Sequence, residues 1–157
     1  PPTVAAVVDF QRIMADSKAA RSINDQIDAR RKLYLDELSR EEQRLYEVDK
    51  QLARQRGVLA QDAFAQRRRE FEQQVQEAQR LSQERRRQLE AARGEALGLV
   101  RTAVVEVVDE ISKTRGFNLV LPSSGVLLYA PALDLTQEVM TRLDQRLPTV
   151  KVPDKVD

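Results

Sequence analysis

The chain of 157 residues contains no cysteine, no histidine and no tryptophan. Without cysteine it has no disulfide, no thiolate nucleophile and no cysteine-based zinc site. Without histidine it lacks the usual general base and the commonest metal ligand, which excludes serine triads and histidine-metal hydrolases. A glycine-rich phosphate-binding loop is absent as well. These absences predict a protein that is not an enzyme and holds no cofactor and no metal.

Aromatic residues make up only 4% of the chain, whereas charged residues reach 32% with a net charge of +1. A compact core of this size usually contains more aromatic residues, because they bury large areas. The chain is therefore either disordered or elongated. Disorder is disfavoured, because 41% of the residues are hydrophobic and no proline occurs between Pro2 and Pro122. That stretch is rich in Ala, Leu, Arg, Gln and Glu, which favour long helices.

Two long helices are predicted within residues 17–116, joined at a tip near residues 57–63. Seven-residue steps relate the apolar positions of the first helix, Leu38, Leu45, Leu52 and Leu59, and of the second, Phe64, Phe71, Ala78, Ala92 and Leu99. Polar residues such as Glu41 and Gln55 interrupt the seam, so the pairing is only coiled-coil-like. The short connection makes the two helices antiparallel.

The boundaries of these helices carry their own signals. Ser17 is the expected N-cap of the first helix, and Asp62 is the expected N-cap of the second. Lys113 and Arg115 occupy the last turn of the second helix, where cations suit the helix dipole, and Gly116 follows at the C′ position.

The dense apolar runs lie at the two ends of the chain. Residues 3–9 and 117–121 predict short buried strands, and residues 125–130 predict a third strand. The intervening Pro-Ser-Ser-Gly sequence predicts a turn that joins the last two strands into a β-hairpin.

A final helix is expected after these strands. Asp134 and Gln137 resemble a capping box, with Thr136 as a rival cap, and Pro148 ends the helix. The residues that follow, 151–157, are expected to form a polar, frayed tail.

The predicted fold class is α+β and mostly α. A long antiparallel helical hairpin, the arm, covers residues 17–116, and residues 1–16 and 117–150 form one discontinuous β-rich body with a C-terminal helix. Such a body is near the lower size limit for an independent core, and its exposed strand edges would favour aggregation in a monomer. We therefore expect the body to oligomerise through its apolar strand residues, Val4, Val7, Val8, Leu119, Val120, Leu121, Val126, Leu127, Leu128 and Tyr129.

Three short basic runs are the sharpest charge features of the arm, namely Arg30-Arg31-Lys32, Arg67-Arg68-Arg69 and Arg85-Arg86-Arg87. They either form a solvated helix face or provide a surface for acidic clients and anionic lipid. Nucleic-acid binding is disfavoured, because acidic residues alternate with the arginines and no aromatic platform accompanies them.

Two further features of the arm each have two interpretations. Gly94 and Gly98 lie in a segment rich in small residues, which indicates either close helix packing or a flexible point that lets the arm bend. The aromatic residues of the arm are interpreted as its core, with client contact as the alternative; they are Tyr34, Tyr46, Phe64 and Phe71.

The order strand, helical hairpin, strands and helix resembles the Skp/OmpH family of periplasmic chaperones. Two segments carry the resemblance. The first is Val4-Ala5-Ala6-Val7-Val8-Asp9-Phe10-Gln11-Arg12-Ile13-Met14 through Ser17-Lys18-Ala19-Ala20. The second runs from Phe117-Asn118-Leu119-Val120-Leu121 through Gly125-Val126-Leu127-Leu128-Tyr129-Ala130 to Asp134-Leu135-Thr136-Gln137-Glu138-Val139.

The resemblance implies a jellyfish-like homotrimer with a central strand body and three helical arms around a cavity. It implies an ATP-independent holdase for unfolded outer-membrane β-barrel proteins in the periplasm, and some family members are proposed to bind lipopolysaccharide through basic residues. The absence of cysteine suits an oxidising compartment. Pro1 at the first position is what a mature chain would show after removal of a signal peptide. The alternative is a structural coiled coil, a spacer or adaptor that binds one folded partner.

Overall fold

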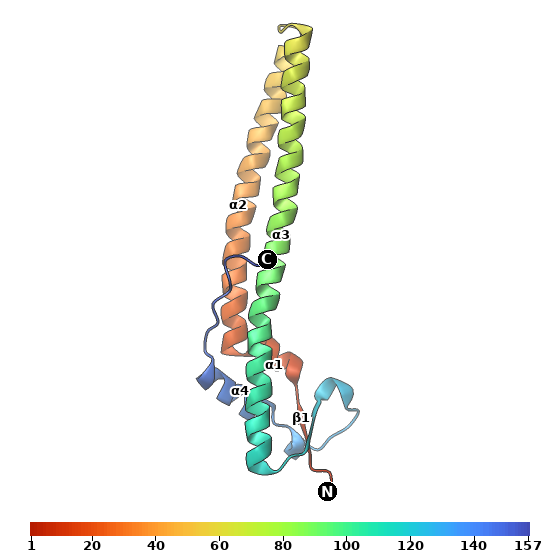
Figure 1. The fold of residues 1–157 in the computed structure, drawn as a ribbon, viewed down its shortest axis with the longest axis vertical. Helices are drawn as coiled ribbons and strands as arrows, with labels where there is room; N and C mark the ends of the chain where they lie inside the picture. Colours follow the sequence, from red (N-terminus) through yellow and green to blue (C-terminus); the bar gives the residue numbers. More distant parts are fainter. The chain divides into compact units, whose positions relative to one another are not determined.

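Helices make up most of the computed structural model, which describes residues 1–157 (Figure 1). The elements follow the order β1 (Ala5–Val8), α1 (Phe10–Asp16), α2 (Lys18–Gln55), α3 (Gln61–Arg115), β2 (Leu119–Pro122), the 3-10 turns η1 (Ser123–Gly125) and η2 (Pro131–Leu133), and α4 (Thr136–Arg146). This confirms the predicted class, mostly α with a small β part. No helix combines the length and apolar character that a membrane-spanning segment requires.

The chain divides into two compact units. The body unit contains residues 1–27 and 91–157, and the hairpin unit contains residues 28–90. The first turns of α2 and nearly half of α3, from residue 91 onward, therefore belong to the body unit. This division differs from the predicted boundaries at residues 17 and 116, because both long helices continue into the core of the body.

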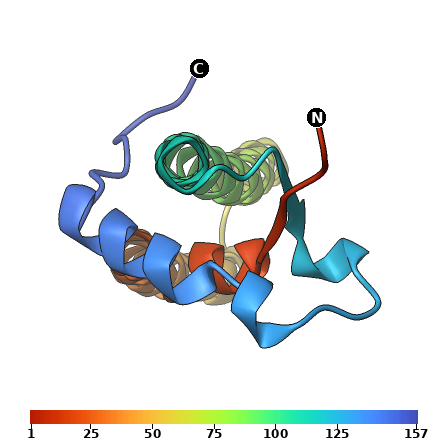
Figure 2. The ribbon, with the colours of Figure 1, turned by 90° about the horizontal axis from the view of Figure 1, so that it is seen from below.

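The sheet of the body unit consists of two parallel strands, β1 and β2, which lie side by side in Figure 2. Their register pairs Ala5 with Leu119 and Val8 with Pro122. Asn118 extends the pairing, because its side-chain oxygen accepts a hydrogen bond from the Val4 amide at 2.7 Å. Parallel strands need a long crossover connection, which the helices between residues 10 and 115 provide.

The predicted third strand and its β-hairpin are wrong. Residues 125–130 form no strand, and Gly125 lies in η1 instead of a two-strand turn. The second edge of β1 is taken by the segment before α4, where the Leu135 amide donates to the Val7 carbonyl at 2.8 Å. With both edges of β1 occupied, residues 126–130 form a loop that extends away from the strands (Figure 2).

The core of the body unit lies where the ends of α2 and α3 meet β1 and α4. The buried residues of α3 recur every three or four positions, which gives one apolar stripe. The fully buried large side chains of this core are Ile13, Ile23, Val100, Val104, Val107, Ile111, Val139, Leu143 and Val152. Small residues precede them in the stripe, Ala92 and Ala96, and both are buried.

The C-terminal segment is docked at its beginning, so the predicted frayed tail is wrong there. Val150 and Val152 are buried, and Gln26 of α2 holds both. The Gln26 amide donates to the Val150 carbonyl at 2.7 Å and its oxygen accepts from the Val152 amide at 3.0 Å. Alternate residues of an extended chain share one face, so both valines point to the core while Lys151 is exposed.

The helix ends confirm two of the predicted caps and correct a third. Ser17 accepts a hydrogen bond from the Ala20 amide at 3.2 Å, and Gly116 ends α3 with a positive φ of 80°. Both assignments are confirmed. Asp62 is not the N-cap of α3, because the helix begins one residue earlier, at Gln61. Asp62 lies in the first turn, where a carboxylate still suits the dipole.

The start of α4 is held by Asp134 without a capping box. One carboxylate oxygen of Asp134 accepts from both the amide and the hydroxyl of Thr136, at 2.8 and 2.5 Å. Gln137 donates forward to Thr141 instead of back to the cap. The Thr136 hydroxyl also accepts from the Asp9 amide at 2.8 Å, which joins α4 to the end of β1.

Candidate functional site

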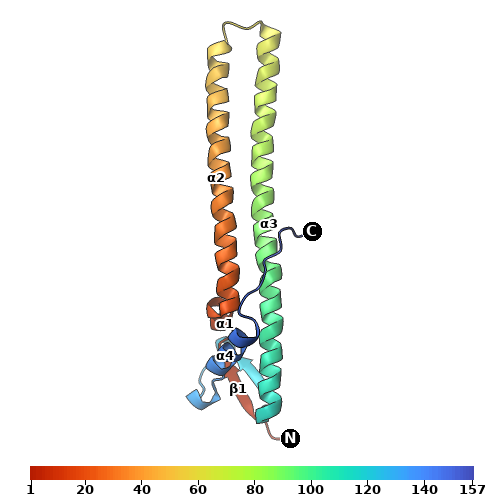
Figure 3. The same ribbon diagram turned by 90° about the vertical axis from the view of Figure 1, so that its left-hand side faces the viewer.

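The seam between α2 and α3 in the hairpin unit is thinly packed. In Figure 3 the two helices run antiparallel and are joined by one short connection. Tyr34 and Leu52 are the only buried apolar residues of this unit, 7% and 8% exposed. The other seam residues are half-buried; they include Leu38, Leu45, Val48, Phe71, Val75 and Ala78. Two helices alone cannot enclose a seam, so their apolar side chains remain partly in contact with water.

The aromatic residues of the hairpin unit divide by environment. Tyr34 is buried, which confirms it as a core residue, and Phe64 and Phe71 are half-buried. Tyr46 is 54% exposed, and the Lys50 ammonium lies 4.4 Å from its ring centroid. The interpretation of Tyr46 as core is therefore wrong, because its position on α2 faces away from α3.

Polar bridges between α2 and α3 set the register of the hairpin unit. The hydroxyls of Tyr34 and Ser82 are 2.5 Å apart, and Arg85 pairs with Glu37. Arg44 donates to the Gln74 side chain at 3.2 Å. The Ser82 hydrogen bond lowers the pKa of Tyr34 against the opposing effect of burial, and the nearby guanidinium groups of Arg86 and Arg85 lower it further.

The nine residues of the basic runs lie in the hairpin unit, and all but the half-buried Arg30 are exposed. Three of them pair with an acidic residue of their own helix, as Arg31 does with Asp28 at 3.1 Å. The other two such pairs are Arg68 with Glu72 and Arg87 with Glu84. Arg67 and Arg69 contact glutamines, Gln55 and Gln66. These partners support the solvated helix face more than a strongly cationic surface.

The Glu84–Arg87 pair predicts a pH response of the hairpin unit. The Arg87 hydrogen bond, helped by Gln88 and Arg80, lowers the pKa of Glu84 to about 2. A depressed pKa in the folded state stabilises the fold above the ordinary carboxyl pKa, and this stabilisation is lost as the pH falls towards 2. NMR titration should therefore place the Glu84 midpoint well below 4.5, and Arg87→Gln should raise it. Equal midpoints in both proteins would contradict the pairing.

Most of the exposed large apolar residues of the body unit lie in or beside β2 and in the loop after it, and the other two, Leu99 and Val105, lie on α3. Leu127 and Leu128 are almost completely exposed, and Leu119 and Leu121 are 42% and 37% exposed. Val4, beside β2, is 43% exposed. The remaining predicted oligomerisation residues are less accessible: Val7 and Val8 are buried within their own chain, and Val120, Val126 and Tyr129 are half-buried. Apolar surface of this kind commonly marks an interaction site.

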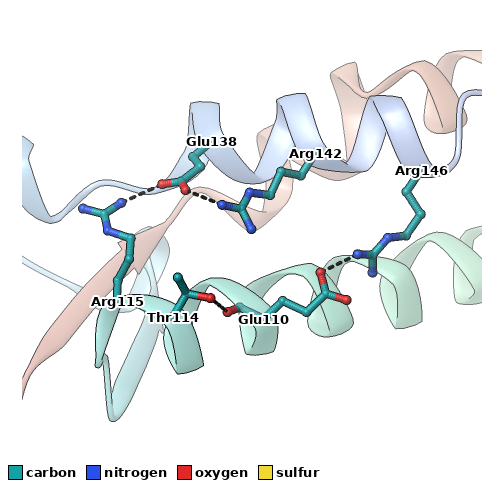
Figure 4. A network of polar contacts seen from close by, with 6 residues as sticks. All are labelled: Glu110, Thr114, Arg115, Glu138, Arg142 and Arg146. Atoms are coloured by element: carbon teal, nitrogen blue, oxygen red, sulfur yellow. Dashed lines mark hydrogen bonds and ion pairs between the residues drawn. The ribbon is translucent and has the colours of Figure 1, made fainter.

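Ion pairs fix α4 to the end of α3 and so anchor the loop before it (Figure 4). Glu138 of α4 accepts from Arg115 at 2.6 Å and from Arg142 at 3.1 Å. Arg146 pairs with Glu110, one turn away from Thr114 on α3. The sequence marked none of these residues as a group, because the two pairs that join α3 to α4 link positions 23 and 36 residues apart.

Gly94 and Gly98 lie in α3, within the body unit, and both are exposed. A Cβ atom at either position would meet nothing within 4 Å. Within this small-residue segment, the buried Ala92 and Ala96 provide the close packing, and the two glycines do not contribute to it. Flexibility at Gly94 and Gly98 stays a prediction.

Comparison with known proteins agrees with the architecture. The family described as "Outer membrane protein (OmpH-like)" matches residues 4–143. This chain belongs to the OmpH-like family. The Skp/OmpH resemblance of the sequence is thereby confirmed. Among curated proteins, none matches this OmpH-like chain.

A crystal structure from Caulobacter crescentus, provisionally assigned as an OmpH-like outer membrane chaperone, has the same fold. The two structures superpose with a TM-score of 0.90 at 22% sequence identity. The match covers 100% of this chain and 94% of the other. At this identity the similarity concerns the fold.

Proposed function

We propose that this OmpH-like protein is an ATP-independent holdase chaperone that binds unfolded outer-membrane proteins in the periplasm and prevents their aggregation. Membership of the OmpH-like family supports the assignment. The observation that carries it is the distribution of apolar surface on the hairpin unit. Single exposed side chains are spread along it, Leu33, Leu35, Tyr46, Val58 and Leu81, at 45% to 82% exposure.

This distribution suits a holdase because such a protein needs many weak contacts. One tight site would hold its client and prevent release, whereas scattered apolar side chains each bury a small area on contact and so contribute little. Several arms that surround one client add avidity without strong individual sites. Release then follows when the client folds elsewhere, and no nucleotide is needed.

We further propose that the protein is a homotrimer, assembled through the exposed apolar residues of the body unit. Leu127 and Leu128 supply the most accessible apolar surface, and Leu119 and Leu121 of β2 lie on one face of their strand. In the trimer, the arms would enclose the client cavity. Contact of the basic runs with anionic lipid or lipopolysaccharide stays a prediction.

The holdase function is tested with a urea-unfolded outer-membrane β-barrel protein diluted into buffer. We expect the light scattering of aggregation to be suppressed at one trimer per client, without ATP. Bovine serum albumin at equal mass is the control. Undiminished aggregation at stoichiometric trimer would overturn the holdase assignment and favour the alternative, a spacer that binds one folded partner.

The trimer is tested by solution mass. We expect a particle of three 17.9 kDa chains in analytical ultracentrifugation. Replacing both Leu127 and Leu128 by aspartate should shift the mass towards a single chain, because carboxylates cannot be buried at the contact without large cost. The matched control replaces Leu33 and Leu35 of α2 by aspartate. A wild-type dimer, or an unchanged mass in the loop variant, would contradict the proposed assembly.

A further inference from the structure

The hairpin unit contains a pocket of about 550 Å³ between α2 and α3. Its lining comes from both helices and combines apolar with charged side chains. The volume lies within the range of about 300–1,000 Å³ that is common for ligand sites. None of the contacts described above fills this space.

The sequence explains why the helices leave a gap at this level. Glu41 occupies a heptad position where a core side chain belongs. Its carboxylate instead forms an ion pair with the Arg44 guanidinium on the same helix, at 2.6 Å. Ala78 of α3 also lines the pocket and reaches into it with only a methyl group. The seam is therefore unfilled between Glu41 and Ala78.

Polar bridges on either side keep the gap open. Tyr34 with Ser82 and Glu37 with Arg85 join the helices at one end, and Arg44 with Gln74 joins them at the other. All six residues line the pocket. Because the helices are tied at both ends, they are hindered from collapsing onto the empty layer between the bridges.

The chemistry of the lining defines what would fit. Leu38 and Leu81 provide apolar walls next to the Ala78 methyl group. Of the four carboxylates in the lining, three are neutralised, by Arg85, Arg44 and Arg80. The fourth, Glu70, accepts a hydrogen bond only from the uncharged Gln66. The pocket therefore has apolar walls with one negative charge that lacks a cationic partner.

We propose that this pocket takes one large apolar side chain of an unfolded client, with a lysine or arginine of the client beside it facing Glu70. This proposal rests on the proposed holdase function. The feature of the client that each arm would recognise is the apolar side chain with its basic neighbour. Charge complementarity favours a cation next to the apolar side chain over an anion. One side chain per arm is a weak contact, as release requires.

The test uses peptide binding. The protein has no tryptophan, so the fluorescence of a disordered 15-residue peptide with one central tryptophan reports only on the peptide. Three peptides place lysine, glutamine or glutamate on both sides of the tryptophan. We expect a blue shift on binding and an affinity order of lysine above glutamine above glutamate, about three-fold or more at each step.

Variants locate the binding. Ala78→Leu fills the pocket with a side chain that suits the heptad, so we expect binding of the lysine peptide to weaken at least five-fold without loss of helicity. Ala53→Leu is the matched control on the exposed face of α2, outside the pocket, and should bind like wild type. Glu70→Gln should reduce binding of the lysine peptide to the level of the glutamine peptide.

The outcomes separate this proposal from the proposed function. Unchanged peptide binding by Ala78→Leu, with normal suppression of aggregation by wild type, would overturn the pocket and leave the holdase standing. Failure of wild type in both assays would overturn both. A change of solution mass in Ala78→Leu with unchanged peptide binding would assign the pocket to a second copy of the chain and overturn client binding there.

Discussion

Replacing Leu143 by alanine is expected to lower the free energy of unfolding by about 2–5 kcal/mol. Leu143 lies on α4 and is 0% exposed, so the change removes buried contacts and leaves a cavity in the core of the body unit. Urea denaturation followed by circular dichroism at 222 nm measures the loss, as a shift of the midpoint at constant slope.

The control for this prediction is the same substitution at an exposed site. Leu33 on α2 is 65% exposed, and Leu33→Ala should change the stability by less than about 0.5 kcal/mol. Both substitutions replace a leucine on a helix by alanine, so the two sites differ mainly in how deeply the side chain is buried. Similar losses at Leu143 and Leu33 would contradict the assignment of α4 to the core.

The second large effect concerns Thr136, which is 3% exposed and joins three parts of the body unit. Thr136→Val keeps the shape of the side chain but removes the hydroxyl that accepts from Asp9 and donates to Asp134. The Asp9 amide then loses its partner in a partly buried position. We expect a loss of about 1–3 kcal/mol, which is typical for an unsatisfied buried group.

Thr136→Ser tests whether the hydroxyl is responsible. Serine keeps the hydrogen bonds and loses only a methyl group, so its loss of stability should be clearly smaller than that of Thr136→Val. Amide hydrogen exchange at Asp9 should accelerate in the valine variant and stay near wild type in the serine variant. Equal exchange at Asp9 in both variants would show that another group satisfies this amide.

The long helices could be predicted because their signals are local. Heptad leucines, the Ser17 cap and the Gly116 end each depend on residues within one or two turns. The same local pattern failed for residues 126–130, because an apolar run does not say which strand it pairs with. Tertiary structure fills both edges of β1 with residues 119–122 and 134–135, more than 110 positions away in sequence.

For the pocket, too, the sequence identifies the individual positions and only the tertiary structure brings them together. The sequence places Glu41 in the seam and Ala78 on the seven-residue step, so each position could be identified as weakly packed. It does not show that the two share one layer. That depends on the register between α2 and α3, which the contacts of Tyr34 with Ser82 and Arg44 with Gln74 define.

The sequence by itself determined the absence of the usual catalytic residues, the helical hairpin, most helix ends and the family. These follow from composition and from periodicities of a few residues. Only the tertiary structure decided the parallel pairing of β1 with β2, the docking of Val150 and Val152 by Gln26, and the open layer of the hairpin unit. Each depends on contacts between residues at least 30 positions apart, whose partners no local pattern identifies.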